Sequence, residues 1–480
     1  MASTLDIDAR LPLVVDLDGT LTLTDTLYEG FAKLLFQNPA AALASALYLT
    51  NGPAAFKRYI SDRCRLDPAA LPYRTDLIDI LRSEKARGRE IHLVSAADQA
   101  IADAIAGESG LFHTAAGSDG ADNLKGRRKL DYVRGKFAGG FIYAGDASAD
   151  LPVFLAARGV ILCDVGSRVA TAVADAGTPV LATLRRPGHR AQDWLRAVRA
   201  HQWAKNILLF VPLFVGHAYG DPAAVAKAAL AFVLLCLLSS ASYILNDLSD
   251  LDADRAHVTK RLRPFASGTL SVLHGLIAAP LMIVAALAGA YALSPPFAAT
   301  LVAYLVLTSA YSFGLKRIPL LDVFVIGVLF TLRIVMGAEA IGLGHSPWLL
   351  SFALAFFISL ALAKRHGELM RIAQTSSSEI AGRGYRANDW PVTLSFGIGV
   401  GLVSVVIMLL YMTNDATPSG FYRQPSWLYL IPAMVTIWLM RLWLLSNRML
   451  LDDDPVVFAL RDGPSLMLGT VVAVSFFMAL

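Results

Sequence analysis

The stretch Asn246–Gly268, NDLSDLDADRAHVTKRLRPFASG, decides how the rest of this chain is interpreted. It follows residues 223–245, which are mostly apolar and long enough to cross a membrane as a helix. Asp247, Asp250 and Asp254 are spaced by three and four residues, so a helix that continues through them carries all three carboxylates on one face. Carboxylates gathered in this way repel one another unless a cation lies among them. The stretch therefore predicts a cation site at the end of a membrane-spanning helix.

Magnesium suits such a site, because Mg²⁺ prefers carboxylate oxygens and completes its shell with water and substrate phosphates. Lys260, Arg261 and Arg263 follow the acids and bring donors for phosphate oxygens. We therefore expect the three aspartates to hold Mg²⁺ and a diphosphate, with Asp250 in a catalytic role. The alternative is a solvated charged loop without a ligand.

The spacing N-D-x-x-D-x-x-x-D resembles the first aspartate motif of the UbiA superfamily of intramembrane prenyltransferases. The continuation H-x-x-K-R-x-R-P-x-A-S-G is similar to one branch, the polyprenyl-phosphate phosphoribosyltransferases, and so are Q-W-x-K-N at 202–206 and K-R-x-x-E-L at 364–369. The resemblance implies an all-α membrane bundle, phosphoribosyl pyrophosphate as donor and a polyprenyl phosphate as acceptor. Plain anchoring at the membrane surface is the alternative for the basic pair at 364–365. The implied substrate contacts are Gln202, Lys205, Asn206, Asn246, Lys260, Arg261, Arg263, Lys364, Arg365 and Glu368.

A second acidic cluster, which typical UbiA prenyltransferases carry, is reduced here to one carboxylate. Tyr311 and Lys316 precede Asp322, and Ile326 stands where a D-x-x-x-D motif has its second aspartate. We expect Tyr311, Lys316 and Asp322 to contact substrate. The departure favours the phosphoribosyl branch over prenylation of an aromatic acceptor from a prenyl diphosphate, which stays the alternative. An inactive scaffold or transporter is a third interpretation.

Composition changes near residue 200. The 480 residues are 55% hydrophobic and only 17% charged, below the roughly 25% typical of soluble domains, so much of the chain lies in lipid. A net charge of +4 does not suggest nucleic acid as a partner. We predict a front domain at 1–183, a basic linker at 184–200 and a membrane domain at 201–480. About nine apolar spans are expected, centred near Phe210, Phe232, Ile283, Tyr304, Phe330, Phe356, Val403, Pro432 and Val472.

Charged residues predict the orientation. Basic clusters such as 260–263 and 316–317 follow every second span, whereas the loops between them hold one Arg and no Lys. The positive-inside rule places the basic loops in the cytoplasm of an inner-membrane protein. No signal-peptide pattern begins the chain, so we expect the front domain on the same side. Arg333 lies inside a span, where it needs a partner or a wet cavity; we expect it to contact substrate, with a structural ion pair as the alternative.

Residues 13–20, LVVDLDGT, predict an apolar strand that ends in the motif D-x-D-G-T. Later strand-like runs end at Ser95 and just before Asp146, and Lys129 lies on a helical stretch between them. Open parallel sheets bind ligands at these strand ends. The ordered set of motifs resembles the haloacid dehalogenase (HAD) superfamily of phosphatases. That resemblance implies a Rossmann-like α/β fold, with residues 24–85 as a small helical cap.

The HAD resemblance also implies roles for single residues. Asp16 would be the nucleophile and Asp18 the acid/base, while Ser95 and Lys129 would hold the phosphoryl group, with Lys125 as the alternative to Lys129. A degenerate scaffold is the alternative to an active domain. Together the two halves predict a bifunctional enzyme that transfers 5-phosphoribose to the lipid and then removes its 5-phosphate. The implied Mg²⁺ ligands of the front domain are Asp16, Asp18, Asp146 and Asp150.

Overall fold

The computed structural model describes residues 5, 7–120, 122–186, 190–374, 383–451 and 455–480. The chain divides into two compact units, which we call the front unit (Met1–Val198 with Tyr243–Ala279) and the bundle unit (Arg199–Ser242 with Pro280–Leu480). The segment with the acidic motif thus belongs to the front unit, a division that differs from the predicted boundary near residue 200. Of the predicted linker, residues 187–189 lie outside the described residues, and α9 (Arg190–Ala197) follows them.

Six parallel strands form the sheet of the front unit within the described residues, in the order β3-β2-β1-β4-β5-β6. The order reverses between β1 and β4, so the connections leave in opposite directions there and open a crevice at the carboxyl ends of the strands. This arrangement is the predicted Rossmann-like α/β architecture. The strands are β1 (Leu13–Val15), β2 (Ile91–Asp98), β3 (Thr114–Ser118), β4 (Ile142–Gly145), β5 (Gly159–Cys163) and β6 (Val180–Leu184).

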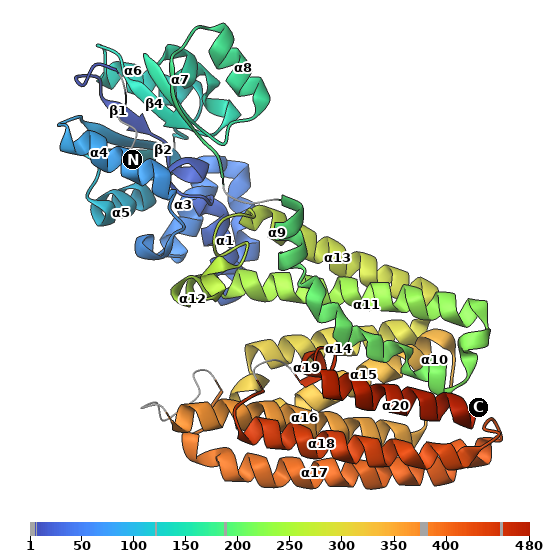
Figure 1. Cartoon of the computed structure of the whole chain (residues 1–480). Coiled ribbons are helices and arrows are strands. Elements are labelled where there is room, and N and C mark those ends of the chain that lie inside the picture. Colours follow the sequence, from blue (N-terminus) through green and yellow to red (C-terminus); the bar gives the residue numbers. More distant parts are fainter. Residues whose placement is uncertain (1–4, 6, 121, 187–189, 375–382, 452–454) are drawn as a thin grey trace. The chain divides into compact units, whose positions relative to one another are not determined.

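Alternating apolar side chains give the sheet two buried faces. Leu13 and Val15 pack on one face and Val14 on the other, because successive side chains of a strand point to opposite sides. The first face is covered by α4 (Thr75–Ala86) and α5 (Gln99–Ser109). The second is covered by three helices, which stand near the sheet in Figure 1. They are α6 (Arg127–Lys136), α7 (Leu151–Ala156) and α8 (Ser167–Asp175).

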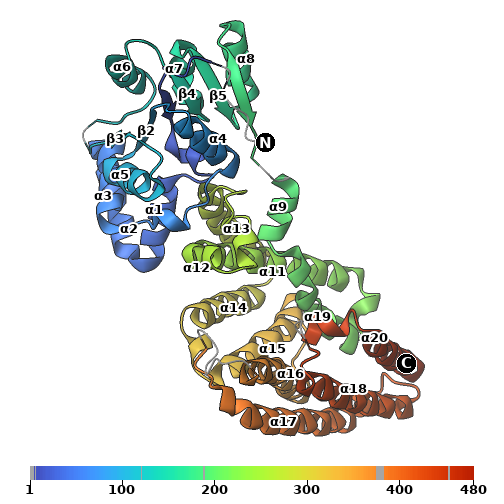
Figure 2. The same ribbon diagram turned by 60° about the vertical axis from the view of Figure 1, so that its left-hand side comes forward.

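Three helices inserted after β1 form a group with its own small core. They are α1 (Thr26–Gln37), α2 (Pro39–Ser45) and α3 (Pro53–Arg63), seen together in Figure 2. Leu34, Tyr59 and Ile60 are buried among them. The predicted cap at 24–85 is therefore too long, because α4 packs against the sheet and not with this group.

Among the described residues, seven helices are long and apolar enough to cross a membrane. The predicted count of about nine is too high. Near Phe210 the chain forms a 3₁₀ segment, Ala200–Phe210, followed by the five residues of α10 (Val211–Val215), and α20 (Gly463–Ala479) is shorter than the others. The seven are Pro222–Ser249 (α11), Val272–Leu293 (α13), Pro295–Phe313 (α14), Leu321–Ile341 (α15), Pro347–Ala373 (α16), Ala387–Ser419, which contains α17 (Trp390–Tyr411), and Pro425–Asn447, which contains α18 (Leu430–Asn447).

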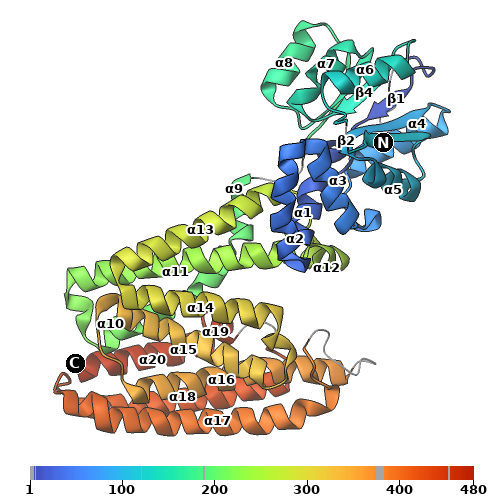
Figure 3. The same cartoon turned by 180° about the vertical axis from the view of Figure 1, so that it is seen from behind.

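Helices α15 to α18 run side by side in the bundle unit (Figures 1 and 3). Their core contains Phe330, Phe357 and Trp443. Gly397 on α17 lies directly against the indole of Trp443, so a side chain at this position would collide with it. Small residues at such crossings let membrane helices approach closely. The bundle also includes the short helix α19 (Pro455–Ala459).

Candidate active sites

The carboxyl ends of β1, β2 and β4 meet at a cavity of about 300 Å³. Asp16 follows β1, Ser95 lies within β2 and Asp146 follows β4. The fold thus gathers residues that are far apart in the sequence at the predicted edge of the sheet. The predicted front-domain residues that line the cavity are Asp16, Asp18, Ser95, Lys129, Asp146 and Asp150.

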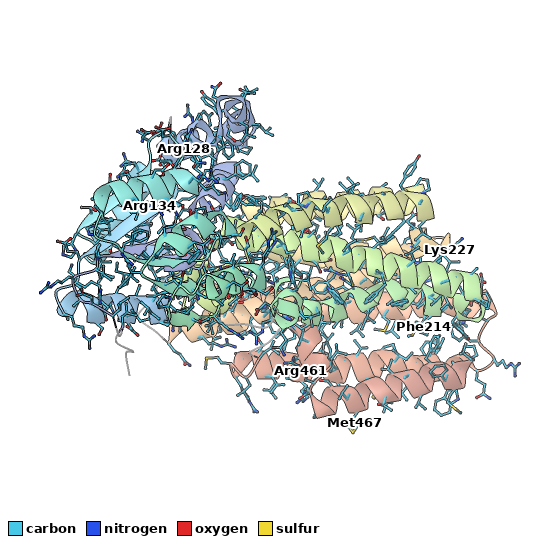
Figure 4. The ribbon with its side chains drawn as sticks, turned by 90° about the horizontal axis from the view of Figure 1, so that it is seen from above. Arg128, Arg134, Phe214, Lys227, Arg461 and Met467 are labelled. Atoms are coloured by element: carbon cyan, nitrogen blue, oxygen red, sulfur yellow. The ribbon has the colours of Figure 1, made fainter. Side chains whose placement is uncertain are left out.

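Lys129 is a buried cation of this cavity. Its Nζ lies 3.1 Å from Asp16 Oδ1 and 2.6 Å from Asp150 Oδ2. Burial alone would lower the pKa of Lys129, but the two carboxylates raise it above its usual value. Arg128 and Arg134, on the same helix, lie on its outer surface (Figure 4). Only the inward face of α6 therefore brings its charge to the strand ends.

Tyr143 is a residue of this site that the sequence interpretation missed. Its hydroxyl accepts a hydrogen bond from Lys129 Nζ at 3.1 Å and donates to Asp150 Oδ2 at 2.6 Å. Lys125, the alternative to Lys129, also lines the cavity, whereas the contact with Asp16 comes from Lys129. The alternation of β4 was the available signal for Tyr143, since it places this side chain toward α6.

Two further carboxyl groups of the cavity have a pKa raised above the usual value of an aspartate. Asp18 Oδ1 accepts a hydrogen bond at 2.8 Å from the amide of Thr26, the first residue of α1. Burial, and next the Asp25 carboxylate, raise the pKa of Asp18 well above its usual value. Burial, and next Asp16, raise the pKa of Asp146 to about 7. Such groups either carry a proton near neutral pH or need a nearby cation.

Among the described residues, no group of three or more His, Cys, Asp or Glu side chains is arranged to hold a metal ion. The metal sites inferred from the sequence therefore stay predictions. Asp16 and Asp146 still suit Mg²⁺ chemically, because Asp16 is buried, Asp146 is half-buried, and the two carboxylates line one cavity and repel each other. Gly19, at φ +73°, lies against the Asp146 carboxylate, where a side chain would collide with it.

The acidic motif is built from two helices. The expected continuous helix is wrong: α11 ends at Ser249, Asp250 has non-helical φ/ψ angles (−103°, 15°), and α12 (Leu251–Ala256) begins after it. Asp247 and Asp254 are nevertheless brought together, because Arg263 Nη1 lies 3.1 Å from Asp247 Oδ1 and 2.6 Å from Asp254 Oδ2. Both carboxylates are buried, so they need the cation that Arg263 supplies.

Asp250 stands apart from this pair. It accepts hydrogen bonds from Asn246 Nδ2 at 3.1 Å and from the Ser249 hydroxyl at 3.3 Å. Lys260 and Arg261 are exposed in the 3₁₀ turn Lys260–Leu262. The site therefore combines buried acids with solvent-accessible basic groups, an arrangement that suits a metal–phosphate ligand.

The reduced second motif is neutralised in the bundle unit. Asp322, at the start of α15, is fully buried and accepts from Arg365 Nη2 at 2.8 Å. The Tyr385 hydroxyl donates to its other oxygen at 2.6 Å. Arg365 also pairs with Glu368, one turn along α16. Asp322, Arg365 and Glu368 are predicted substrate contacts. Tyr385, which lies in a loop 63 residues after Asp322, has no predicted role.

Arg333 and Asn206 are brought together inside the bundle unit. Arg333 Nε donates to Asn206 Oδ1 at 3.0 Å, and its other nitrogens donate to the Leu329 carbonyl at 2.6 Å and to the Tyr304 hydroxyl at 2.9 Å. These partners are neutral, so these contacts are hydrogen bonds and do not form the structural ion pair that was the alternative. The three contacts hold the Arg333 guanidinium in the apolar bundle, and none of the three partners is a carboxylate.

The remaining predicted residues lie on helices and turns of the bundle unit. Each is partly buried, which leaves part of its side chain accessible. Lys205 Nζ lies 6.0 Å from the ring centre of Phe330, a distance at which a cation–π attraction begins. The remaining predicted residues are Gln202 and Lys205 in Ala200–Phe210, Tyr311 in α14, Lys316 in the turn Leu315–Arg317 and Lys364 in α16.

Fold and site together define a multi-pass membrane protein with an attached parallel α/β domain. Residues 209–459 match the UbiA prenyltransferase family, and the chain belongs to that family. The resemblance predicted from the aspartate motif is thereby confirmed for the membrane domain. The HAD resemblance of the front domain stays a prediction.

Two curated relatives illustrate the family. The chain is 47% identical over 473 residues to the uncharacterized protein y4nM of Sinorhizobium fredii, an alignment that covers 98% of this chain and 92% of that protein. It is 33% identical over 196 residues to the decaprenyl-phosphate phosphoribosyltransferase of Mycobacterium tuberculosis, covering 40% of this chain and 65% of that enzyme. Among solved structures, a UbiA homologue from Archaeoglobus fulgidus bound to DMAPP and Mg²⁺ aligns with a TM-score of 0.45 and 15% identity, over 60% of this chain and 97% of that one.

Proposed function

We propose that the membrane domain transfers 5-phosphoribose from phosphoribosyl pyrophosphate to a polyprenyl phosphate. The observation that carries this is the state of Asp322, whose two oxygens are taken by Arg365 and Tyr385. An aromatic prenyltransferase of this family would need a second pair of carboxylates for another Mg²⁺, and Ile326 and Arg365 leave this motif with neither a pair nor a free charge. The mycobacterial relative, whose name states the phosphoribosyl reaction, supports the same choice.

The donor would bind at the first motif. Asp247, Asp250 and Asp254 would hold Mg²⁺, which neutralises charge on the diphosphate leaving group when it is bound. Lys260, Arg261 and Arg263 donate to the phosphate oxygens. Asp250, held by Asn246, orients the donor beside them. The other residues that are predicted from the sequence to contact substrate are part of the same proposal.

The front domain would hydrolyse a phosphate monoester. Asp16 attacks phosphorus, the bond to the leaving oxygen breaks, and the Asp18 carboxyl gives that oxygen its proton. The raised pKa of Asp18 favours the protonated form that this step requires. Asp18 then takes a proton from the water that cleaves the aspartyl-phosphate. Lys129 and Ser95 hold the phosphoryl oxygens. Asp16, Asp18, Asp146 and Asp150 would hold Mg²⁺, which neutralises charge on the phosphoryl group when it is bound.

The two reactions would be consecutive. Phosphoribosyl transfer leaves a polyprenyl-phosphoryl ribose that still carries a 5-phosphate, which is a phosphate monoester. Both domains belong to one chain and, by the loop charges, face the cytoplasm, so tethering raises the effective concentration of this intermediate to about millimolar. The product would be polyprenyl-phosphoryl ribose.

A donor comparison tests the proposal. Purified protein is given phosphoribosyl pyrophosphate with polyprenyl phosphate, or a prenyl diphosphate with a hydroxybenzoate. We expect lipid-linked ribose from the first pair and no product from the second. A prenylated aromatic product would establish the alternative reaction instead.

A further inference from the structure

The inserted helices of the front domain are joined to the acidic-motif segment by a buried ion pair. Glu29 on α1 and Arg255 on α12 are 226 residues apart in sequence, and their side chains are 2% and 7% exposed. Two guanidinium nitrogens of Arg255 donate to the two oxygens of Glu29, one of them at 3.0 Å, and Nε donates to the Ala266 carbonyl at 2.9 Å. Figure 3 shows α1 and α12 side by side. One arginine thus connects the inserted helices, α12 and the loop that precedes α13.

That loop packs tightly against the front domain. A side chain at Gly268 would place its Cβ 2.7 Å from the Cβ of Leu23, and the φ of +75° at Gly268 is itself unfavourable for other residues. A second, exposed pair, Lys33 with Asp252 at 2.7 Å, lies at the same junction. The contact is therefore continuous from α12 to the residues just before α13.

The loop also completes the strand-end cavity. Ser271, the residue before α13, lines the cavity together with Leu23 and Thr24. The Thr24 side chain is only 4% exposed, and its hydroxyl has no hydrogen-bond partner among the described residues. A buried hydroxyl without a partner is costly, so a ligand group that bonds to it would be favoured.

We infer that the strand-end cavity takes a phosphate monoester carried on a membrane lipid, with Thr24 and Ser271 binding the polar group next to the phosphate. The inference rests on the proposed phosphatase function. Its basis is that the wall at Ser271 is the start of α13, a helix apolar enough to cross a membrane. The Glu29–Arg255 pair holds this wall against the inserted helices. A lipid-linked sugar phosphate reaches such a cavity from the membrane surface, whereas a soluble phosphate does not need the wall.

The test compares two substrates in the full chain: a polyprenyl-phosphoryl ribose 5-phosphate in vesicles and free ribose 5-phosphate. Glu29→Gln keeps the side-chain shape but leaves Arg255 buried without its counter-charge, which is strongly destabilising for the contact. We expect hydrolysis of the lipid substrate to fall about tenfold or more, and hydrolysis of ribose 5-phosphate to change less than about twofold. Combining Glu29→Arg with Arg255→Glu restores the lipid reaction. Asp252→Asn, at the exposed pair, is the matched control and changes neither reaction.

A second variant addresses the binding group. Thr24→Val keeps the volume and removes the hydroxyl, so the KM for the lipid substrate rises while kcat is kept. Hydrogen exchange of residues 23–30 and 264–271 gives a readout without activity, and Glu29→Gln raises exchange in both segments.

Equal losses on both substrates in Glu29→Gln, or unchanged exchange, would overturn the inference. So would hydrolysis of free ribose 5-phosphate, but not of the lipid substrate, by the unmodified protein, and that result leaves the phosphatase proposal standing. Hydrolysis of neither substrate contradicts the phosphatase proposal itself, and the inference that rests on it.

Discussion

Arg365 Nη2 lies 2.8 Å from Asp322 Oδ2, and the two side chains are 2% and 0% exposed. A buried ion pair is a weak source of net stability, but removal of one partner leaves the other charge without compensation. The pair therefore ties α15 to α16 and gives the buried Asp322 carboxylate a counter-charge within the protein.

The first prediction concerns this pair. Arg365→Leu should destabilise the protein by about 3–5 kcal/mol, because Asp322 stays buried and charged. Thermal unfolding in detergent measures the effect. The control is Arg128→Gln, which breaks the pair with Asp122 where the two side chains are 64% and 77% exposed; it should cost only about 0–1 kcal/mol. Equal losses of stability in the two variants would show that breaking the buried pair costs no more than breaking an exposed one.

The second prediction concerns the acidic motif. Asp250→Asn and Asp254→Asn should reduce phosphoribosyl transfer by at least about 100-fold, since even an outer-shell partner of a metal site is worth about 10–100-fold. Excess EDTA should have the same effect. Asp252→Asn is the matched control, because its side chain is 46% exposed and pairs with Lys33. Full turnover in Asp250→Asn, or in EDTA, contradicts the metal assignment.

The fold could be predicted from local patterns where those patterns are periodic. The strand endings at Asp16, Ser95 and Asp146 follow from apolar runs that stop at polar residues, and the structure places them at one sheet edge. The span count was wrong because apolar composition does not distinguish a 3₁₀ segment from an α-helix. Pro212, near the start of α10, was the signal that no long helix is centred at Phe210.

The site partners were harder to predict because they are distant in sequence. Arg255 meets Glu29 across 226 residues, and Tyr385 reaches Asp322 across 63. Gly384, at φ +65°, lies so close to the Arg317 carbonyl that a side chain there would collide with it, which fixes the loop that presents Tyr385. The sequence shows Gly384 between Arg383 and Tyr385, but only the folded chain shows that it approaches the Arg317 carbonyl.

The third prediction concerns orientation. The loop charges predict that Thr259 lies in the cytoplasm and Thr417 outside. A cysteine introduced at Thr417 should react with an impermeant thiol reagent in intact cells, and one at Thr259 should react only after lysis. The three native cysteines are buried, so they give little background. Labelling of Thr259 alone in intact cells reverses the proposed topology.

The fourth prediction separates the two activities. Asp16→Asn removes the proposed nucleophile but leaves the membrane domain unchanged. The variant should accumulate polyprenyl-phosphoryl ribose 5-phosphate while transfer continues at the original rate. Asp175→Asn, at the exposed end of α8, is a control outside the cavity. If Asp16→Asn yields the same product mixture as the unmodified protein, the front domain does not act on this intermediate.

The central claim is that this chain moves 5-phosphoribose onto a polyprenyl phosphate. The most direct measurement follows lipid products by mass spectrometry after purified protein is mixed with phosphoribosyl pyrophosphate, polyprenyl phosphate and Mg²⁺. We expect that a lipid heavier by one phosphoribosyl group forms first and then loses its terminal phosphate. If the protein is folded and the lipid acceptor stays unchanged in the presence of donor and Mg²⁺, the claim of phosphoribosyl transfer is contradicted.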